Sequence, residues 1–195
     1  MFSVSHTRLK ELLLDTLRRN GPVTFERYMA LCLYHPDFGY YIQGRERTGV
    51  AGDYFTSSDL HPVFARLVAR QAAEMWNAMG RPRPFTWVEM GAGRGLFASD
   101  FLSWSAGALP QFFAALDYVA IEPGLAQRDR IEARVASVGG GTKVRLFANL
   151  DKLAPSTGCF FSNELVDAFP VNVVTRTGGH LKEIYVAAEG DGLRE

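Results

Sequence analysis

The sequence predicts an α/β fold, in which a helical N-terminal region (residues 1–83) precedes a parallel sheet flanked by helices (residues 84–195). Three observations lead to this prediction. Apolar residues recur at helical spacing in the first third of the chain, β-rich runs alternate with helical stretches after Pro84, and a glycine-rich turn follows the first of these runs. Such alternation implies right-handed crossovers and a parallel sheet covered on both faces.

The N-terminal region is expected to hold three helices. Leucines at helical spacing predict the first from Ser5, and the Asn-Gly-Pro sequence at 20–22 ends it. Thr24 is a plausible N-cap for a second short helix. The glycine-rich, charged stretch 44–56 is predicted to be a loop, and a third helix begins around Pro62.

The C-terminal region begins after a cluster of glycine, arginine and proline at 80–84. The expected parallel strands are residues 85–90, 117–122, 143–147 and 158–162, in the spatial order 3-2-1-4. Helices are expected from Leu96 and from Leu125, with an inserted loop at 105–110. Residues 171–175 and 181–186, joined through Gly178-Gly179, predict a β-hairpin.

Composition and charge exclude several classes of protein. Of 195 residues, 47% are hydrophobic and 22% are charged, which is typical of a globular domain with or without an appendage. Lys+Arg and Asp+Glu both number 21, so no net field favours nucleic acid or an anionic membrane. Cys32 and Cys159 form no disulfide framework and no zinc spacing, and the four histidines are scattered, so we expect no metal. With no apolar run long enough to insert into a membrane, we expect a cytoplasmic protein.

The most informative segment is Gly91-Ala92-Gly93-Arg94-Gly95, which follows the first predicted strand. Glycines at a strand-to-helix junction let the backbone turn sharply and let a ligand approach. In an open α/β sheet this junction lies at the carboxyl edge, where ligands bind. A dinucleotide fingerprint would need its third glycine at the position of Leu96, so a nicotinamide-dependent oxidoreductase is disfavoured.

Two acidic residues narrow the choice of ligand. Glu89 stands two residues before Gly91, where a carboxylate repels a pyrophosphate and favours a cation. Glu122 ends the second strand, 31 residues after Gly91, and can accept both hydroxyls of a ribose. S-adenosylmethionine fits, because it carries a ribose, an ammonium and a sulfonium but no phosphate. The alternative is a glycine turn that merely connects strand and helix, with Glu122 as a solvated strand end.

Four sequence blocks resemble those of the MidA-type methyltransferases, the bacterial relatives of a mitochondrial complex I assembly factor that methylates a protein arginine. The blocks are YMALCL at 28–33 with HPDFGYY at 35–41, GDYFTSS at 52–58, VEMGAGRGL at 88–96, and NELVDAFPV at 163–171. Together they cover nearly the whole chain in family order. The resemblance implies a Rossmann-like class I methyltransferase sheet without its C-terminal part, since the family is roughly twice as long.

By this resemblance, Gly91, Ala92, Gly93 and Glu122 contact S-adenosylmethionine, and Glu89 orders the loop. Thr56 and Ser57 approach the same site, so that the N-terminal region covers the cofactor. The usual block reads Thr-Ser-Pro-Glu, whereas residues 56–59 here read Thr-Ser-Ser-Asp and lack the proline.

Asn163 and Glu164 follow the fourth strand, next to the glycine loop in the predicted sheet order. A carboxylate can grip two N–H groups of an arginine and leave a third nitrogen facing the methyl group. We assign this grip to Glu164, with Asp167 as a second candidate; either acid could instead favour a helix N-terminus. Asn163 could contact the adenine or amino-acid part of the cofactor, or cap the helix.

The sequence therefore predicts an S-adenosylmethionine-dependent methyltransferase that acts on a protein side chain. The resemblance alone supplies arginine as the target and a respiratory complex I subunit as the partner, and it makes the expected cytoplasm a bacterial one. The alternative is a non-catalytic assembly factor that uses the same fold to bind a partner protein. Oligomeric state is left open.

Overall fold

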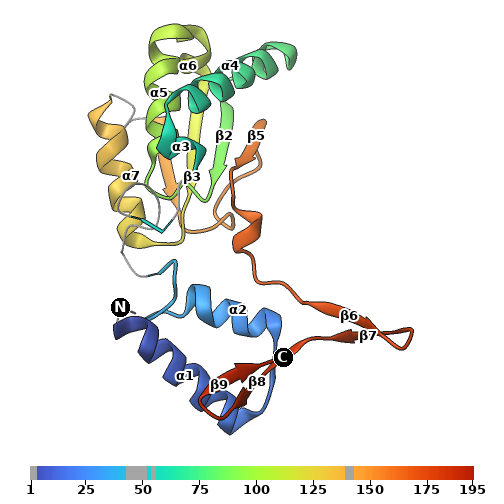
Figure 1. The fold of residues 1–195 in the computed structure, drawn as a ribbon. Helices are drawn as coiled ribbons and strands as arrows, with labels where there is room; N and C mark the ends of the chain where they lie inside the picture. Colours follow the sequence, from blue (N-terminus) through green and yellow to red (C-terminus); the bar gives the residue numbers. More distant parts are fainter. Residues whose placement is uncertain (1–3, 43–51, 54–55, 139–142) are drawn as a thin grey trace. The chain divides into compact units, whose positions relative to one another are not determined.

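The structure is a computed structural model that describes residues 4–42, 52–53, 56–138 and 143–195. The chain divides into two compact units (Figure 1). The central unit comprises Gly44–Leu165, and the terminal unit comprises Met1–Gln43 together with Val166–Glu195. This division differs from the predicted boundary at 83/84 in two ways: residues 56–83 group with the parallel sheet, and the last thirty residues group with the N-terminal helices.

The central unit contains a four-stranded parallel sheet in the order β4-β3-β2-β5. Its strands are β2 (Phe85–Met90), β3 (Leu116–Ile121), β4 (Val144–Phe147) and β5 (Gly158–Ser162). Its helices are α3 (Ser57–Leu60), α4 (Val63–Ala78), α5 (Leu96–Ala108), α6 (Pro110–Ala115) and α7 (Leu125–Ser137). The predicted strand order 3-2-1-4 is confirmed.

The main core lies on one face of this sheet. Alternate side chains of β2 and β3, among them Phe85, Trp87 and Tyr118, pack against buried residues of α4, α5, α6 and α7. The opposite face carries a smaller cluster of Val88, Val119 and Ile121. No described helix residue belongs to that cluster. In the described part of the chain, therefore, the expectation of helices on both faces is not met.

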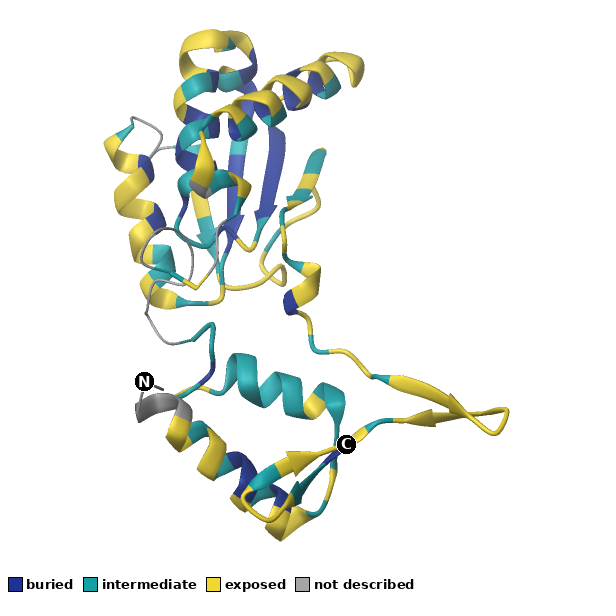
Figure 2. Cartoon of the chain, viewed as in Figure 1, coloured by how far each residue is buried: buried dark blue, intermediate teal, exposed yellow. Residues whose placement is uncertain are grey.

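Burial differs sharply between the strands (Figure 2). β2 and β3 are buried along almost their whole length, as expected for central parallel strands. In contrast, β5 lies at an end of the sheet and its Phe160 side chain is 61% exposed. Among the described strands β5 pairs only with β2, and its exposed aromatic residue leaves apolar surface in contact with water.

One sequence prediction in the central unit is wrong. Residues 105–110 do not form an inserted loop, because α5 continues through Ala108 and α6 begins at Pro110. The physical reason lies in two residues that usually break helices. Gly107 has open space around it and is tolerated within the last turn of α5, and Pro110 occupies the first turn of α6, where its missing N–H costs nothing.

The terminal unit combines the first and the last segments of the chain. Its elements are α1 (Val4–Asn20), β1 (Val23–Thr24), α2 (Phe25–Tyr34), a 3₁₀ turn (Val166–Ala168), β6 (Val174–Thr177), β7 (His180–Glu183), β8 (Tyr185–Glu189) and β9 (Gly192–Arg194). The strands β1, β8 and β9 form an antiparallel sheet, against which α1 packs. Leu13, Leu14 and Leu17 of α1 and Val186 of β8 are all buried.

Most local predictions for the terminal segments hold. Thr24 caps α2, since its Oγ1 accepts a hydrogen bond from the Arg27 amide at 3.2 Å. The predicted hairpin is β6–β7, with bounds one to three residues from those expected. Gly178 and Gly179 both have positive φ, as a two-residue type I′ turn requires. The predicted loop at 44–56 lies largely outside the described residues, of which only 52, 53 and 56 are included.

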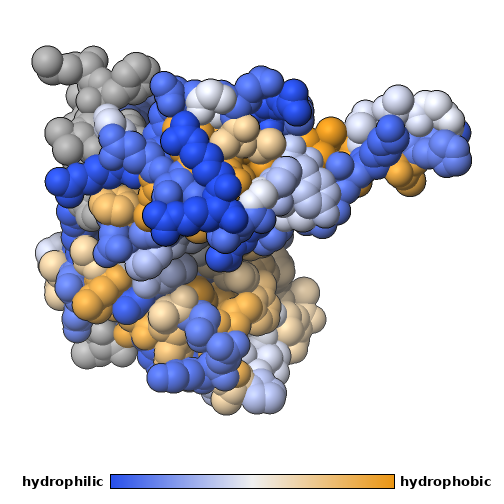
Figure 3. Space-filling view, turned by 90° about the horizontal axis from the view of Figure 1, so that it is seen from below, coloured by the Kyte–Doolittle hydropathy of each residue, from blue (hydrophilic) through white to orange (hydrophobic). Residues whose placement is uncertain are grey.

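The β6–β7 hairpin is exposed on both sides. All eight of its strand residues are exposed, and Val174 and Leu181 place apolar side chains on its surface (Figure 3). An isolated two-stranded hairpin is marginally stable in water. Among the described helices, none is long and apolar enough to cross a bilayer.

Candidate cofactor site

The glycine loop turns sharply between β2 and α5. Gly91, Gly93 and Gly95 have φ values of 73°, 54° and 72°, in the left-handed region that side chains with a Cβ rarely adopt. The Gly91 and Ala92 amides donate to the Ile121 carbonyl at 2.9 and 3.3 Å. These two bonds fasten the loop to the end of β3.

Neighbouring segments approach this loop closely. A Cβ on Gly91 would lie 2.9 Å from Leu165 Cδ1, in the segment that follows β5. A Cβ on Gly95 would lie 3.1 Å from Ile131 in α7. Gly91 and Gly95 are therefore required both by their backbone conformation and by the space available.

Glu122 is the acid that contacts the loop. Its Oε2 accepts a hydrogen bond from the Gly93 amide at 3.0 Å, and its Oε1 accepts one from the Gly124 amide at 3.1 Å. Each carboxylate oxygen has two lone-pair sites, so one on each remains for further donors such as the two hydroxyls of a ribose. The residues present thus fit the sugar of S-adenosylmethionine, because the carboxylate is already oriented by backbone amides.

Burial and hydrogen bonding act on Glu122 in opposite directions. Burial raises the pKa of its carboxyl group, while the Gly124 and Gly93 amides and the Arg128 guanidinium lower it. Arg128 also fixes the turn after β3, because its Nη1 donates to the carbonyls of Glu122 and Pro123 at 2.6 and 2.7 Å. The positively charged Arg128 side chain therefore stabilises the turn that holds Glu122, the predicted ribose-binding residue.

Glu89 is held differently from what we expected. We predicted that it orders the glycine loop, whereas the Gly93 amide of the loop donates its hydrogen bond to Glu122. The Glu89 carboxyl group accepts a hydrogen bond from the Tyr118 hydroxyl at 2.7 Å, and both side chains are buried. Burial raises the pKa of Glu89 to about 8, with the Tyr118 hydrogen bond lowering it and nearby Glu122 raising it.

Asn163 and Glu164 follow β5 at the edge of the sheet where the glycine loop follows β2. Ser162 of β5 pairs with Met90 of β2, so the segments that follow these two strands leave the same edge of the sheet. Glu164 has a φ of 51°, which is unusual for a residue other than glycine. Such backbone outliers cluster at functional sites, where the surrounding structure maintains them.

The other predicted residues lie on other elements. Thr56 and Ser57 lie at the start of α3, which packs against α4 and α5 in the central unit. Asp167 lies in the terminal unit, on the 3₁₀ turn whose Ala168 carbonyl accepts a hydrogen bond from the Tyr34 hydroxyl at 2.8 Å. The roles of Thr56, Ser57 and Asp167 stay predictions.

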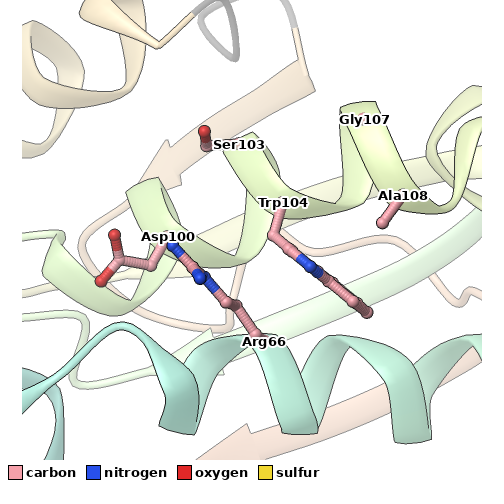
Figure 4. Close-up of a pocket in the computed structure, with 6 residues that line it drawn as sticks. All are labelled: Arg66, Asp100, Ser103, Trp104, Gly107 and Ala108. Atoms are coloured by element: carbon pink, nitrogen blue, oxygen red, sulfur yellow. The ribbon is translucent and has the colours of Figure 1, made fainter.

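A separate cavity of about 460 Å³ opens between α4 and α5. Arg66 reaches from α4 toward Asp100 on α5, and Trp104 points from α5 toward α4 (Figure 4). Burial raises the pKa of Asp100, which Arg66, Arg134 and His61 partly offset. None of the predicted site residues lines this cavity.

Among the described residues, no cluster of His, Cys, Asp or Glu could hold a metal ion.

Sequence reasoning missed two residues that form hydrogen bonds with the predicted acids, Tyr118 with Glu89 and Arg128 with Glu122. A signal for Tyr118 was available, because a hydroxyl in a buried strand must find a partner and Glu89 is the buried acid of the neighbouring strand. Arg128 gave no comparable signal, since an arginine in the first turn of a helix is usually solvated.

A family model described as "Putative S-adenosyl-L-methionine-dependent methyltransferase" matches residues 67–194, which include β2 to β9 and the whole glycine loop. The chain belongs to this family. The family membership confirms the predicted resemblance, and the parallel sheet with its glycine loop agrees with the predicted Rossmann-like fold.

Relatives in this family include proteins of known name. The chain is 28% identical to the mitochondrial protein arginine methyltransferase NDUFAF7 homologue of Drosophila melanogaster, over 97% of this chain and 47% of that protein. It is 34% identical to human mitochondrial protein arginine methyltransferase NDUFAF7 over 90 residues, 46% of this chain and 20% of the human protein. The chain thus spans about half the length of the Drosophila relative.

Two solved structures share the fold. A Burkholderia thailandensis COG1565 superfamily protein, bound to S-adenosyl-homocysteine, superposes with a TM-score of 0.78 and 26% identity. The match covers 96% of this chain and 48% of that protein. A second structure, of an uncharacterised COG1565 superfamily protein from the same organism, gives a TM-score of 0.75 at 28% identity, over 96% of this chain and 46% of that one.

Proposed function

We propose that this chain binds S-adenosylmethionine at the Gly91–Gly95 loop and takes part in methyl transfer to a protein arginine. The main observation behind the cofactor assignment is that two backbone amides orient the Glu122 carboxylate beside the glycine loop. Family membership and the S-adenosyl-homocysteine bound to the Burkholderia structure support it. The names of the NDUFAF7 relatives support arginine as the acceptor.

When bound, the cofactor would supply an electrophilic methyl group on its sulfonium: as the acceptor nitrogen forms a bond to the methyl carbon, the C–S bond on the opposite side would break, and the thioether would leave as S-adenosyl-homocysteine. This chain's residues position the partners. Glu122 binds the sugar, and the exposed Glu164 carboxylate, at the same sheet edge, grips two guanidinium N–H groups so that the third nitrogen faces the methyl group. The guanidinium loses one proton to solvent as the new N–C bond forms.

The protein acceptor follows from the MidA-type resemblance, in which a respiratory complex I subunit is the substrate. The first acceptor to test is therefore an arginine-containing subunit of that complex from the same cell. The resemblance also supports a cytoplasmic location.

Calorimetric titration with S-adenosyl-homocysteine tests the cofactor assignment. Gly93→Val forces a β-branched side chain into a left-handed conformation, and we expect it to abolish most of the affinity. Gly107→Val is the matched control, because Gly107 has open space around it in α5. Unchanged binding by Gly93→Val, or wild-type stabilisation by NAD instead of S-adenosyl-homocysteine, would contradict the assignment.

Transfer of a tritiated methyl group to the acceptor tests the catalytic assignment. Glu164→Gln is expected to keep cofactor affinity and to lose methyl transfer, whereas Glu132→Gln on the exposed side of α7 should change neither. Full activity in Glu164→Gln would exclude Glu164 as the substrate carboxylate. A wild-type chain that binds the cofactor but methylates nothing would favour the assembly-factor alternative.

A further inference from the structure

Tyr118 and Glu89 form a buried polar pair within an otherwise apolar sheet face. Tyr118 is 0% exposed and Glu89 is 5% exposed, and the hydroxyl donates to the carboxyl group at 2.7 Å. Phe101 packs edge-on against the Tyr118 ring at 5.5 Å. Burying such groups is costly unless they are paired, and apolar side chains of similar shape would serve packing equally well. Stability alone therefore does not account for this pair.

The pair lies at the predicted cofactor site. Glu89 is two residues before Gly91 on β2, and Tyr118 is on the adjacent strand β3, which leads directly to Glu122. Among the described groups, Tyr118 and Glu122 are those that act on the Glu89 carboxyl group. Two carboxyl groups that lie close together away from water are rarely both ionised, because the two negative charges repel each other. A positively charged ligand between them compensates this repulsion, so both groups can then be ionised.

We propose that Tyr118 is a positioning residue of the cofactor site, whose hydroxyl fixes the Glu89 carboxyl group beside Glu122 so that uptake of a cationic methyl donor releases a proton from Glu89. This inference rests on the proposed function and adds a named residue and a proton linkage to it. S-adenosylmethionine carries the sulfonium charge that favours an ionised Glu89. S-adenosyl-homocysteine lacks that charge.

The linkage has a definite sign. Glu89 is mostly protonated below pH 8 in the free chain, since burial raises its pKa to about 8. The affinity for S-adenosylmethionine therefore rises with pH up to about pH 8. Above this pH, Glu89 is already ionised in the ligand-free chain, and the affinity no longer depends on its protonation. Affinity for S-adenosyl-homocysteine changes less over the same range, so the ratio of the two affinities is itself pH-dependent.

Calorimetric titration of both ligands between pH 6.5 and 9, in buffers of different ionisation enthalpy, measures affinity and proton release together. Tyr118→Phe removes the hydrogen bond that lowers the pKa of Glu89, so the pH profile for S-adenosylmethionine should move upward by about one unit. Glu89→Gln should abolish the excess pH dependence and proton release that S-adenosylmethionine shows over S-adenosyl-homocysteine, since the amino group that the two ligands share titrates in both. Tyr185→Phe, at a partly exposed tyrosine in the terminal unit, should behave as wild type.

A wild-type profile in Tyr118→Phe, or unchanged proton release in Glu89→Gln, would overturn the inference. A merely structural tyrosine would lower stability and affinity at every pH without moving the profile. Titration of the ¹³C-labelled Glu89 carboxyl carbon in the ligand-free chain is a second measurement that needs no binding. If the wild type binds neither ligand, the proposed function fails, and equal Glu89 midpoints in wild type and Tyr118→Phe would separately refute Tyr118 as a positioning residue.

Discussion

Glu164 combines an exposed carboxylate, which we assign to the substrate, with a left-handed backbone conformation, which lowers the stability of the fold. Its φ of 51° costs free energy that a glycine would not incur. Glu164→Gly should therefore raise the free energy of unfolding by about 0.5–1 kcal/mol while removing methyl transfer. Urea denaturation of the variant measures the gain.

Arg81 provides the comparison, because it also has a positive φ, of 60°. Its guanidinium donates to Asn77 Oδ1 at 2.8 Å and lies over the Trp76 ring, so Arg81→Gly should gain nothing or lose stability. A loss of stability in Glu164→Gly would mean that the Glu164 side chain contributes contacts, and the assignment of its strain to function would be withdrawn.

Glu122 is the residue on which the geometry of the loop depends most directly. Glu122→Gln turns one acceptor oxygen into an NH₂ group that faces a backbone N–H, of either Gly93 or Gly124. We expect a loss of about 1–2 kcal/mol in unfolding free energy and at least tenfold weaker cofactor binding. Thermal unfolding with and without S-adenosyl-homocysteine separates the two effects, and equal ligand-induced stabilisation in both proteins would contradict the prediction.

Glu89 also makes stability depend on pH. Its folded pKa of about 8 is above the ordinary value of 4.5, so the folded chain binds more protons than the unfolded chain between these pH values. The contribution of Glu89 is complete below about pH 4.5 and is lost as pH rises to 8. The unfolding free energy of wild type, relative to Glu89→Gln, should fall by up to about 1.4 kcal/mol per pH unit in this window. A flat difference would show that Glu89 is ionised throughout.

Much of the site could be predicted from residue types. Three glycines in five positions predict the left-handed turn, and an acid at the end of the next strand predicts a partner for the loop. The division of roles between Glu89 and Glu122 was not predictable, because both are acids near one loop. Only the pairing of β2 with β3 decides which carboxyl group reaches Gly93 and which reaches Tyr118.

The exposed edge of strand β5 favours association between chains. Phe160 is 61% exposed on a strand that pairs only with β2 among the described strands, and such edges promote association between chains. Phe160→Thr keeps a high β-propensity and removes the apolar ring. It should reduce self-association in light scattering with less than about 1 kcal/mol change in unfolding free energy. An unchanged mass distribution would show that the β5 edge does not mediate association.

Regular elements were predictable where local signals agree. Strands 85–90 and 158–162 follow from apolar runs bounded by turn residues, and their order follows from the rules for parallel connections. The junction of α5 and α6 was not predictable from the sequence. Glycine and proline end a helix when they fall in its interior, whereas Gly107 and Pro110 are tolerated here in the last turn of α5 and the first turn of α6. The pairing of β1 with β8 joins opposite ends of the sequence, and two residues of strand carry no local signal for it.

At the scale of the molecule, the two units should respond independently to truncation. Removal of residues 185–195 deletes β8 and β9 and exposes the apolar side of α1, including Leu13 and Leu17. Hydrogen exchange should then become fast in α1 and α2, while the parallel sheet stays protected. Loss of protection in β2 and β3 would show instead that the central unit needs the terminal one to fold.

The discontinuous terminal unit has a consequence for the order in which the nascent protein folds. The central unit is one uninterrupted stretch, so it can collapse while later residues are still inside the ribosome. The leucine face of α1 emerges before the central unit yet must wait until Val186 has been synthesised before it is covered. During translation, therefore, α1 stays uncovered while the whole central unit is made, and its leucine face is where a chaperone would be needed.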